Sequence, residues 1–407
     1  MPPGSADAHR DSAGDAAARG GSSDRSDPLA FAAAAVDDLQ ERGLYRPRRI
    51  FERQEDGRLV AEGRPCLDFA SNDYLGLLAS GPLSYELLAG AGASALVTGR
   101  SPSVAALEQA IARFERTESA LVFPTGYAAC QGTTAALVHS GDAVFLDKLC
   151  HSCLVEGARL SRATLRVYRD DRLEALARDL AKHVRSRRRL IVTDGVFSMD
   201  GRLAPLPELL ALAEQFDALL LVDEAHATGV FGSGGRGACE HFGLSSDRLI
   251  RVGTLSKAVA ALGGFAVGPV RLIDFLRHHA RTQMFSTALP PIVCAAASVG
   301  LTVIRHEPER RERLHTAAER VRRDLRAQGW TIPESVGPIL PVHLGLPERT
   351  TSLAAKLETD GLVVGAIRPP TVPRGTSRLR IVVNAEHSDD DLAALVAAMD
   401  VHRADAV

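Results

Sequence analysis

The sequence predicts an α/β fold with a mostly parallel central sheet and a smaller C-terminal α/β domain. Apolar segments of strand length recur from residue 120 onward, and helix-periodic segments separate them. Strands without a polar face are typical of parallel sheets whose two faces are both covered by helices. After about residue 290 the pattern changes to a long helical segment followed by short strands and helices, which indicates the second domain.

Four regions follow one another along the chain. Residues 1–28 are mostly Gly, Ser, Asp, Ala and Arg, with almost nothing to bury, and we expect a disordered tail. Residues 29–75 begin with a helical pattern and continue into a short strand pair at 57–70, so we interpret them as an N-terminal helix and arm. Residues 76–305 hold the alternating segments of the large domain, and residues 306–407 form the small domain.

Periodicity places the elements of the large domain. Apolar residues recur every three or four positions at 103–116, 173–184 and 206–216, which predicts helices. Short apolar runs predict strands, of which the first and last continue into turns. These runs lie at 120–126, 142–147, 189–197, 218–226 and 248–257.

Composition excludes several classes of protein. A net charge of -2 gives no general attraction to nucleic acid or to an anionic membrane. The apolar run at 292–304 is too short to span a bilayer. The six cysteines include a C-x-x-C motif at 150–153 but no second pair that would complete a zinc site. We therefore expect a cytoplasmic protein with reduced thiols and no metal.

Polar residues stand at or just beyond three of the expected strands. They are Asp194 with Ser198, Asp223 with His226, and Thr254 with Lys257. Because ligands of doubly wound sheets bind at the carboxyl ends of the strands, these residues are expected to gather at one site.

Lys257 is the strongest single candidate. Only four of the 48 basic residues other than histidine are lysines, so the chain usually chooses arginine for its surface charge. An amine, unlike a guanidinium, can lose its proton and attack a carbonyl group. Small neighbours on both sides, including Gly253 and Ala258, leave room for a ligand. This disfavours an ordinary surface cation and predicts that Lys257 forms a Schiff base.

The other candidates keep two interpretations each. Asp223 ends an apolar run and is either a structural acceptor or the partner of a protonated ring nitrogen. His151 follows a strand and is either structural or stacked on a planar ring. The backbone N–H groups of Gly126 and Tyr127 open a helix and could bind a phosphate. A nucleoside triphosphatase is excluded because no lysine lies in a G-x-x-x-x-G-K-[ST] loop.

Together these residues resemble the aspartate-aminotransferase-like fold, fold type I, of pyridoxal-phosphate (PLP) enzymes, and within it the α-oxoamine synthase family. The resemblance covers about residues 44–387. It rests on these segments: NDYLGL (72–77), FPTGYAA (123–129), DGVFSMDGRLAPL (194–206), VDEAHATGVFGSGGRG (222–237), TLSKA (254–258), FSTALPP (285–291) and IRPPTVPRGTSRLRIVV (367–383). Members of the family are acyltransferases that condense an amino acid with an acyl thioester.

The resemblance implies a role for each matching residue. Lys257 would hold PLP as a Schiff base and move the substrate proton, and Asp223 would pair with the pyridinium nitrogen. The remaining cofactor contacts would come from His151 stacked on the ring, His226 and Ser198 near the ring hydroxyl, and Gly126, Tyr127 and Thr254 at the phosphate. Of these, His151 and His226 are also expected to be catalytic. Ser286 and Thr287 would reach the phosphate from the other subunit of a homodimer.

The resemblance also bears on the substrates. Arg380 would bind the amino acid carboxylate, with Thr371 also at the substrate site and Arg46 meeting the acyl-chain carboxylate. The segment 366–381 is more similar to family members that join L-alanine to a pimeloyl thioester than to those that use glycine or serine. The alternative within the family is a synthase that uses a different acyl thioester, or glycine or serine. The chain departs from the family at Asp194, where a glutamate is common, and in residues 98–108, which lack a common histidine. A non-catalytic ligand sensor on the same fold is the alternative of a different class.

Overall fold

The computed structural model describes residues 27, 29–41, 45, 48, 50–53, 59–61, 63–66 and 90–406. The N-terminal part contains helix α1 (Ala30–Glu41) and a small antiparallel meander, which has three strands where the sequence analysis expected a pair. The meander consists of β1 (Phe51–Arg53), β2 (Leu59–Ala61) and β3 (Arg64–Cys66).

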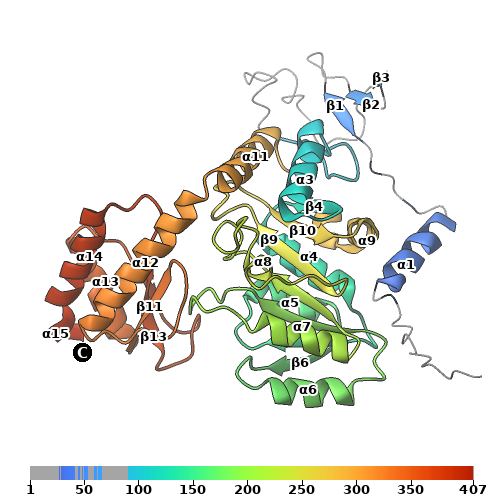
Figure 1. The fold of residues 1–407 in the computed structure, drawn as a ribbon. Helices are drawn as coiled ribbons and strands as arrows, with labels where there is room; N and C mark the ends of the chain where they lie inside the picture. The colour runs from blue at the N-terminus through green and yellow to red at the C-terminus, as the bar shows by residue number, and fades with distance from the viewer. Residues whose placement is uncertain are drawn as a thin grey trace, which may run out of the picture.

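A seven-stranded sheet forms the centre of the molecule, with the strand order β4-β10-β9-β8-β7-β5-β6 (Figure 1). Neighbouring strands from β9 to β6 pair in parallel, whereas β10 pairs antiparallel with both β4 and β9. The expected mostly parallel sheet is therefore confirmed. Its strands are β4 (Ser119–Phe123), β5 (Ala143–Asp147), β6 (Thr164–Tyr168), β7 (Arg189–Asp194), β8 (Leu219–Asp223), β9 (Leu249–Thr254) and β10 (Gly264–Gly268).

Helices cover both faces of this sheet because its strands bury alternate residues on opposite sides. Val144 and Leu146 of β5 pack into one core with residues of α4, α5 and α9, whereas Phe145 packs into a second core with residues of α6 and α7. A third core joins α3 and α11 to β4 and β10. The helices of this part are α3 (Pro102–Glu115), α4 (Gly126–Leu137), α5 (Ser152–Leu160), α6 (Leu173–Lys182), α7 (Leu206–Gln215), α8 (Ala238–His241), α9 (Val270–His279), α10 (Arg281–Met284) and α11 (Pro291–His306).

The C-terminal part has a core of its own, lying to one side of the large sheet (Figure 1). A three-stranded antiparallel sheet, in the order β11-β13-β12, packs against helices. The elements are α12 (Glu309–Ala327), β11 (Ile339–Gly345), α13 (Pro347–Thr359), β12 (Gly365–Ile367), β13 (Ser377–Val382), α14 (Asp389–Val401) and α15 (Arg403–Ala406).

The long helical segment expected after residue 290 is divided into α11 and α12. The break falls at Glu307 and Pro308, because proline lacks the N–H group of a helix interior and disfavours helical geometry in the residue before it. Of the helices in the described part of the chain, none combines the length and the apolar character needed to cross a bilayer.

Candidate active site

The carboxyl ends of β4, β7, β8 and β9 surround a pocket of about 260 Å³. Each of these strands ends in, or leads into, a polar residue that lines the pocket. The pocket brings together Gly126, His151, Asp194, Asp223, Thr254 and Lys257, which come from five separate segments of the chain. The convergence expected from the strand ends is therefore present.

Lys257 follows β9 and extends into this pocket, where its side chain remains accessible. The surrounding protein removes water from the amine and lowers its pKa below the usual value, and the negative charge of Asp223 partly opposes this effect. A lowered pKa increases the fraction of neutral amine, which is the form that attacks a carbonyl group.

Asp223 is the last residue of β8 and is buried. Its Oδ1 accepts a hydrogen bond from the Ala225 N–H at 2.9 Å, and its Oδ2 accepts one from the Cys130 thiol at 3.1 Å. These two bonds fix the carboxylate at the base of the pocket. The next residue, Glu224, has another role, because its carboxylate accepts the Ala238 and Cys239 N–H groups at the start of α8.

Asp194 lies beside Asp223, because β7 and β8 pair in parallel with these two residues in register. Burial and the neighbouring Asp223 charge raise the pKa of Asp194 well above the usual value. Its Oδ1 accepts the His151 N–H at 3.1 Å. Asp194 therefore holds the loop that carries His151, which gives a structural role to this departure from the family pattern.

His151 caps helix α5, and its ring lies at the pocket beside Tyr127, with the ring centroids 6.1 Å apart at an interplanar angle of 81°. The Nδ1 atom lies 2.9 Å from the Cys153 Sγ, and this contact raises the pKa of His151. The second pocket histidine, His226, behaves differently. Burial and the positive charge of Lys257 lower its pKa to about 3, so His226 is neutral at pH 7.

Gly126 and Thr254 form a cradle at the start of α4. A Cβ atom at Gly126 would lie 2.7 Å from both Cβ and Oγ1 of Thr254, so only glycine fits there. The first N–H groups of a helix have no partner within the helix and attract anions. Thr125 accepts the Ala128 N–H, which leaves the N–H groups of Gly126 and Tyr127 at the helix end. Together with Lys257 and Asp223, this cradle fits a phosphorylated aldehyde with a basic ring nitrogen, as PLP is.

Arg380 of β13 lies at the entrance of the site, where a second, largely apolar cavity of about 980 Å³ meets Lys257 and His226. Its Nε donates to the Ser198 carbonyl at 2.7 Å, and no partner for its two terminal nitrogens is found among the described residues. Burial lowers the pKa of Arg380, but an arginine stays charged at pH 7. The free end of the guanidinium can therefore bind a carboxylate.

Several predicted residues lie elsewhere. Ser198 meets Arg380 through its backbone and is not among the described residues that line the 260 Å³ pocket. Ser286 and Thr287 line a separate hollow beside Phe123, and Thr287 pairs with Ser94 in an isolated β-bridge. Thr371 is exposed in the turn after β12. Arg46 and the segment 72–77 lie outside the described residues.

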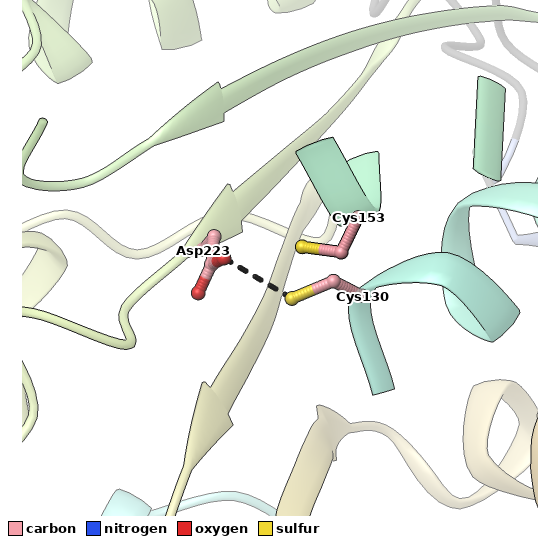
Figure 2. A group of neighbouring side chains, drawn as sticks. All are labelled: Cys130, Cys153 and Asp223. Carbon is pink, nitrogen blue, oxygen red and sulfur yellow. Dashed lines mark hydrogen bonds between the residues drawn. The ribbon is translucent and has the colours of Figure 1, made fainter. Parts of the chain in front are cut away.

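The pocket also contains residues that sequence reasoning missed. Cys130 and Cys153 lie close to each other, and both point toward the Asp223 carboxylate (Figure 2). Ser256 and Thr125 line the wall near Thr254. Cys130 stands four residues after Gly126, and this spacing places it on the same face of α4. That periodicity was the available signal, whereas the contact of Cys130 with a cysteine from another helix leaves no trace in local spacing.

Comparison with known proteins identifies the family. Residues 64–399 match the model of the class I and II aminotransferases. The 8-amino-7-oxononanoate synthase of Methylococcus capsulatus is 45% identical over 376 residues, which cover 90% of this chain and 97% of that protein. The protein of the same name from Geobacter sulfurreducens is 44% identical over 377 residues, covering 90% of this chain and 96% of that protein.

Solved structures show the same fold. Serine palmitoyltransferase from S. paucimobilis, with a bound PLP–myriocin aldimine, has a TM-score of 0.76 and 30% identity, covering 91% of this chain and 96% of its own. The 8-amino-7-oxononanoate synthase of Francisella tularensis has a TM-score of 0.66 and 27% identity, covering 83% of this chain and 98% of its own. The chain therefore belongs to the class I and II aminotransferase family and, within it, to the α-oxoamine synthases.

Proposed function

We propose that this chain is a PLP-dependent acyltransferase that condenses L-alanine with a pimeloyl thioester to give 8-amino-7-oxononanoate, a step of biotin biosynthesis. A carbon–carbon bond forms between Cα of alanine and the thioester carbonyl, while the thiol and CO₂ leave. The observation that carries the proposal is the meeting of Lys257, Asp223 and the Gly126–Thr254 cradle in one pocket. The choice of substrates is supported by the names of the relatives, which align with this chain over nearly their whole length.

PLP, when bound, supplies an aldehyde for amines and a ring that accepts electrons from the substrate Cα. Lys257 would hold PLP through its aldehyde group and would accept and return the proton at the substrate Cα. Its lowered pKa suits both tasks, because a base works best when its pKa is near the working pH. Asp223 keeps the ring nitrogen protonated, which maintains the ring as an electron acceptor.

The remaining residues orient the cofactor and substrates. His151, which Asp194 positions through its backbone N–H, would hold the ring, while neutral His226 and Ser198 would lie near the ring hydroxyl. Tyr127, Gly126 and Thr254 hold the phosphate. Arg380 binds the alanine carboxylate with the end of its guanidinium, because a planar fork and a carboxylate match in geometry.

The apolar cavity of about 980 Å³ beside Lys257 and Arg380 suits the methylene chain of the acyl donor. Arg46 meets the far carboxylate of that chain, and Thr371 contributes to the substrate site. The enzyme works as a cytoplasmic homodimer in which Ser286 and Thr287 of one subunit complete the phosphate site of the other. The acyl carrier is either CoA or acyl carrier protein.

Product analysis tests the substrate choice. Purified enzyme is incubated with pimeloyl-CoA, pimeloyl-acyl carrier protein or a long-chain acyl-CoA, each together with L-alanine, glycine or L-serine. The products are identified by mass spectrometry. We expect 8-amino-7-oxononanoate from L-alanine as the main product. The second candidate function is a synthase that joins serine to a long-chain acyl-CoA, and the structural likeness to serine palmitoyltransferase favours it. A product from serine and a long-chain acyl-CoA would support that function instead. Failure of alanine with every acyl donor contradicts the proposal.

A further inference from the structure

The base of the pocket holds two thiols, those of Cys130 and Cys153, for which the proposed reaction has no use, beside the Asp223 carboxylate. The thiols of Cys130 and Cys153 and the carboxylate of Asp223 offer three ligand atoms that lie within 4.8 Å of one another (Figure 2). All three residues are at most 5% exposed, yet all three line the 260 Å³ pocket. A small solute that enters the pocket can therefore reach them.

A fourth ligand atom is adjacent. The Nδ1 atom of His151 lies 2.9 Å from the Cys153 Sγ. Zinc binds thiolate sulfur at about 2.3 Å and imidazole nitrogen or carboxylate oxygen at about 2.0–2.2 Å, in tetrahedral sites of four ligands. In a tetrahedral site two thiolate sulfurs are thus about 3.8 Å apart, and pairs that include nitrogen or oxygen are closer. The ligand atoms of Cys130, Cys153 and Asp223 lie within 4.8 Å of one another, whereas His151 contacts Cys153 and would have to turn toward the other two residues to complete the set.

We propose that Cys130, Cys153 and Asp223, with His151 as the fourth ligand, bind a soft divalent metal ion such as Zn²⁺ when the cofactor is absent. Binding replaces the two thiol protons, which leave to solvent, by bonds from the thiolates to the ion.

Metal and cofactor exclude each other at this site. The ion takes the Asp223 carboxylate and draws His151 toward it, which are the two groups assigned above to the ring nitrogen and the ring face. This part rests on the proposed function, whereas uptake of the ion by the apoprotein does not. Bound zinc should therefore keep the enzyme free of PLP, and bound PLP should prevent zinc from binding.

The first experiment measures uptake by the full-length apoprotein with its thiols reduced. Zn²⁺ is titrated in competition with a chromophoric chelator, and Co²⁺ is used to detect thiolate ligation by its charge-transfer absorption. We expect one ion per chain and a thiolate–cobalt band. The absence of stoichiometric uptake, or a cobalt spectrum without thiolate ligation, overturns the inference whatever the variants do.

Variants locate the ion. Cys130→Ser and Cys153→Ser should each weaken Zn²⁺ binding by at least roughly 100-fold, because even outer-shell partners of zinc are worth about 10–100-fold. Cys294→Ser is the matched control, since Cys294 is equally buried but lies on α11, away from the cluster. PLP uptake, followed by absorbance, reports that each variant is folded. Equal affinity in the wild type and both cluster variants contradicts the proposed ligands.

Order of addition tests the exclusion. PLP added first should prevent zinc uptake, and zinc added first should slow PLP uptake until a chelator removes the ion. Simultaneous full occupancy by both would contradict mutual exclusion. These experiments measure binding and not turnover. If the assay with alanine and a pimeloyl thioester failed, that result would count against the proposed function and not against the zinc site.

Discussion

Asp147, Asp194 and Asp223 each end a parallel strand, and all three are buried, but their surroundings differ. Asp223 accepts two hydrogen bonds at the base of the pocket. Asp194 lies beside it and holds the His151 loop. Asp147 is not among the residues that line the pocket, and its Oδ2 has no hydrogen-bond partner in the described structure. The same residue type at the same place in the strand thus contributes to the pocket in β7 and β8 but not in β5.

Replacing Asp223 by asparagine should reduce kcat while the protein still binds PLP. The amide keeps the shape of the side chain but loses the charge that keeps the ring nitrogen protonated. We expect a loss of about 10²–10³-fold, the usual cost of removing one preorganised electrostatic partner. Asp147→Asn is the matched control and should retain near wild-type kcat. Equal losses in the two variants would show that the effect is structural, against the assigned role.

Asp147→Asn makes a separate prediction about stability. Burial raises the folded-state pKa of Asp147 to about 7, far above its usual value of 3.8. The folded state therefore binds more protons between these two values, and wild-type stability falls as the pH rises through this range. Each unit of raised pKa costs about 1.4 kcal/mol once the carboxylate is ionised, so asparagine should stabilise the protein by about 1–4 kcal/mol at pH 8.

Denaturant unfolding at several pH values measures this effect. The difference between Asp147→Asn and the wild type should be largest at pH 8 and should shrink toward pH 4. A variant that is less stable than the wild type at pH 8, or a difference independent of pH, would contradict the raised pKa.

At the scale of elements, the five strands expected from apolar runs are β4, β5, β7, β8 and β9. These runs carry a strong signal because the strands are buried on both faces. The apolar runs do not include β6, which is mostly exposed, or β10, which is antiparallel and bounded by Gly264 and Gly268. Glycine weakens strand patterns, and antiparallel pairing depends on partners far away in the sequence.

In the candidate site, too, some residues could be predicted from the sequence and others could not. Lys257, Asp223 and Gly126 could be chosen because each has a distinctive local setting at a strand or helix end. The contact between Cys130 and Cys153 could not, since it depends on how α4 packs against α5. The C-x-x-C motif suggests a pair of Cys150 and Cys153, but Cys150 donates its thiol to the Val192 carbonyl.

Gly126→Ala tests the cradle between β9 and α4. The added Cβ would lie 2.7 Å from Thr254, and overpacking of this kind costs about 1–3 kcal/mol. We expect PLP affinity, measured by absorbance titration, to fall roughly 5- to 150-fold, since about 1.4 kcal/mol is tenfold. Gln131→Ala, on the same helix but directed to Glu156, should bind PLP like the wild type. Unchanged affinity in Gly126→Ala would show that the cofactor phosphate lies elsewhere.

At the scale of the whole molecule, the pocket of one chain lacks Ser286 and Thr287, which lie at a separate hollow. If a partner subunit supplies them, two different inactive variants should complement each other. Lys257→Ala is mixed with the double variant Ser286→Ala, Thr287→Ala under conditions that exchange subunits. A mixed dimer then has one intact site, so activity should recover to roughly a quarter of the wild type.

Complementation requires subunit exchange, which mass spectrometry of the intact dimers can establish. Recovery would place Ser286 and Thr287 in the partner's site. Mixed dimers without recovered activity would show that each chain builds its site alone.

The central claim is that Lys257 is the residue that binds the cofactor aldehyde. Borohydride reduction of the PLP-bound protein, followed by peptide mass spectrometry, identifies the modified lysine directly. We predict that the pyridoxyl group is found on Lys257, that Lys257→Ala loses the imine absorbance, and that Lys182→Ala, an exposed lysine paired with Asp179, keeps it. Reduction that fixes the cofactor on another residue, or an imine spectrum that survives in Lys257→Ala, would contradict the account.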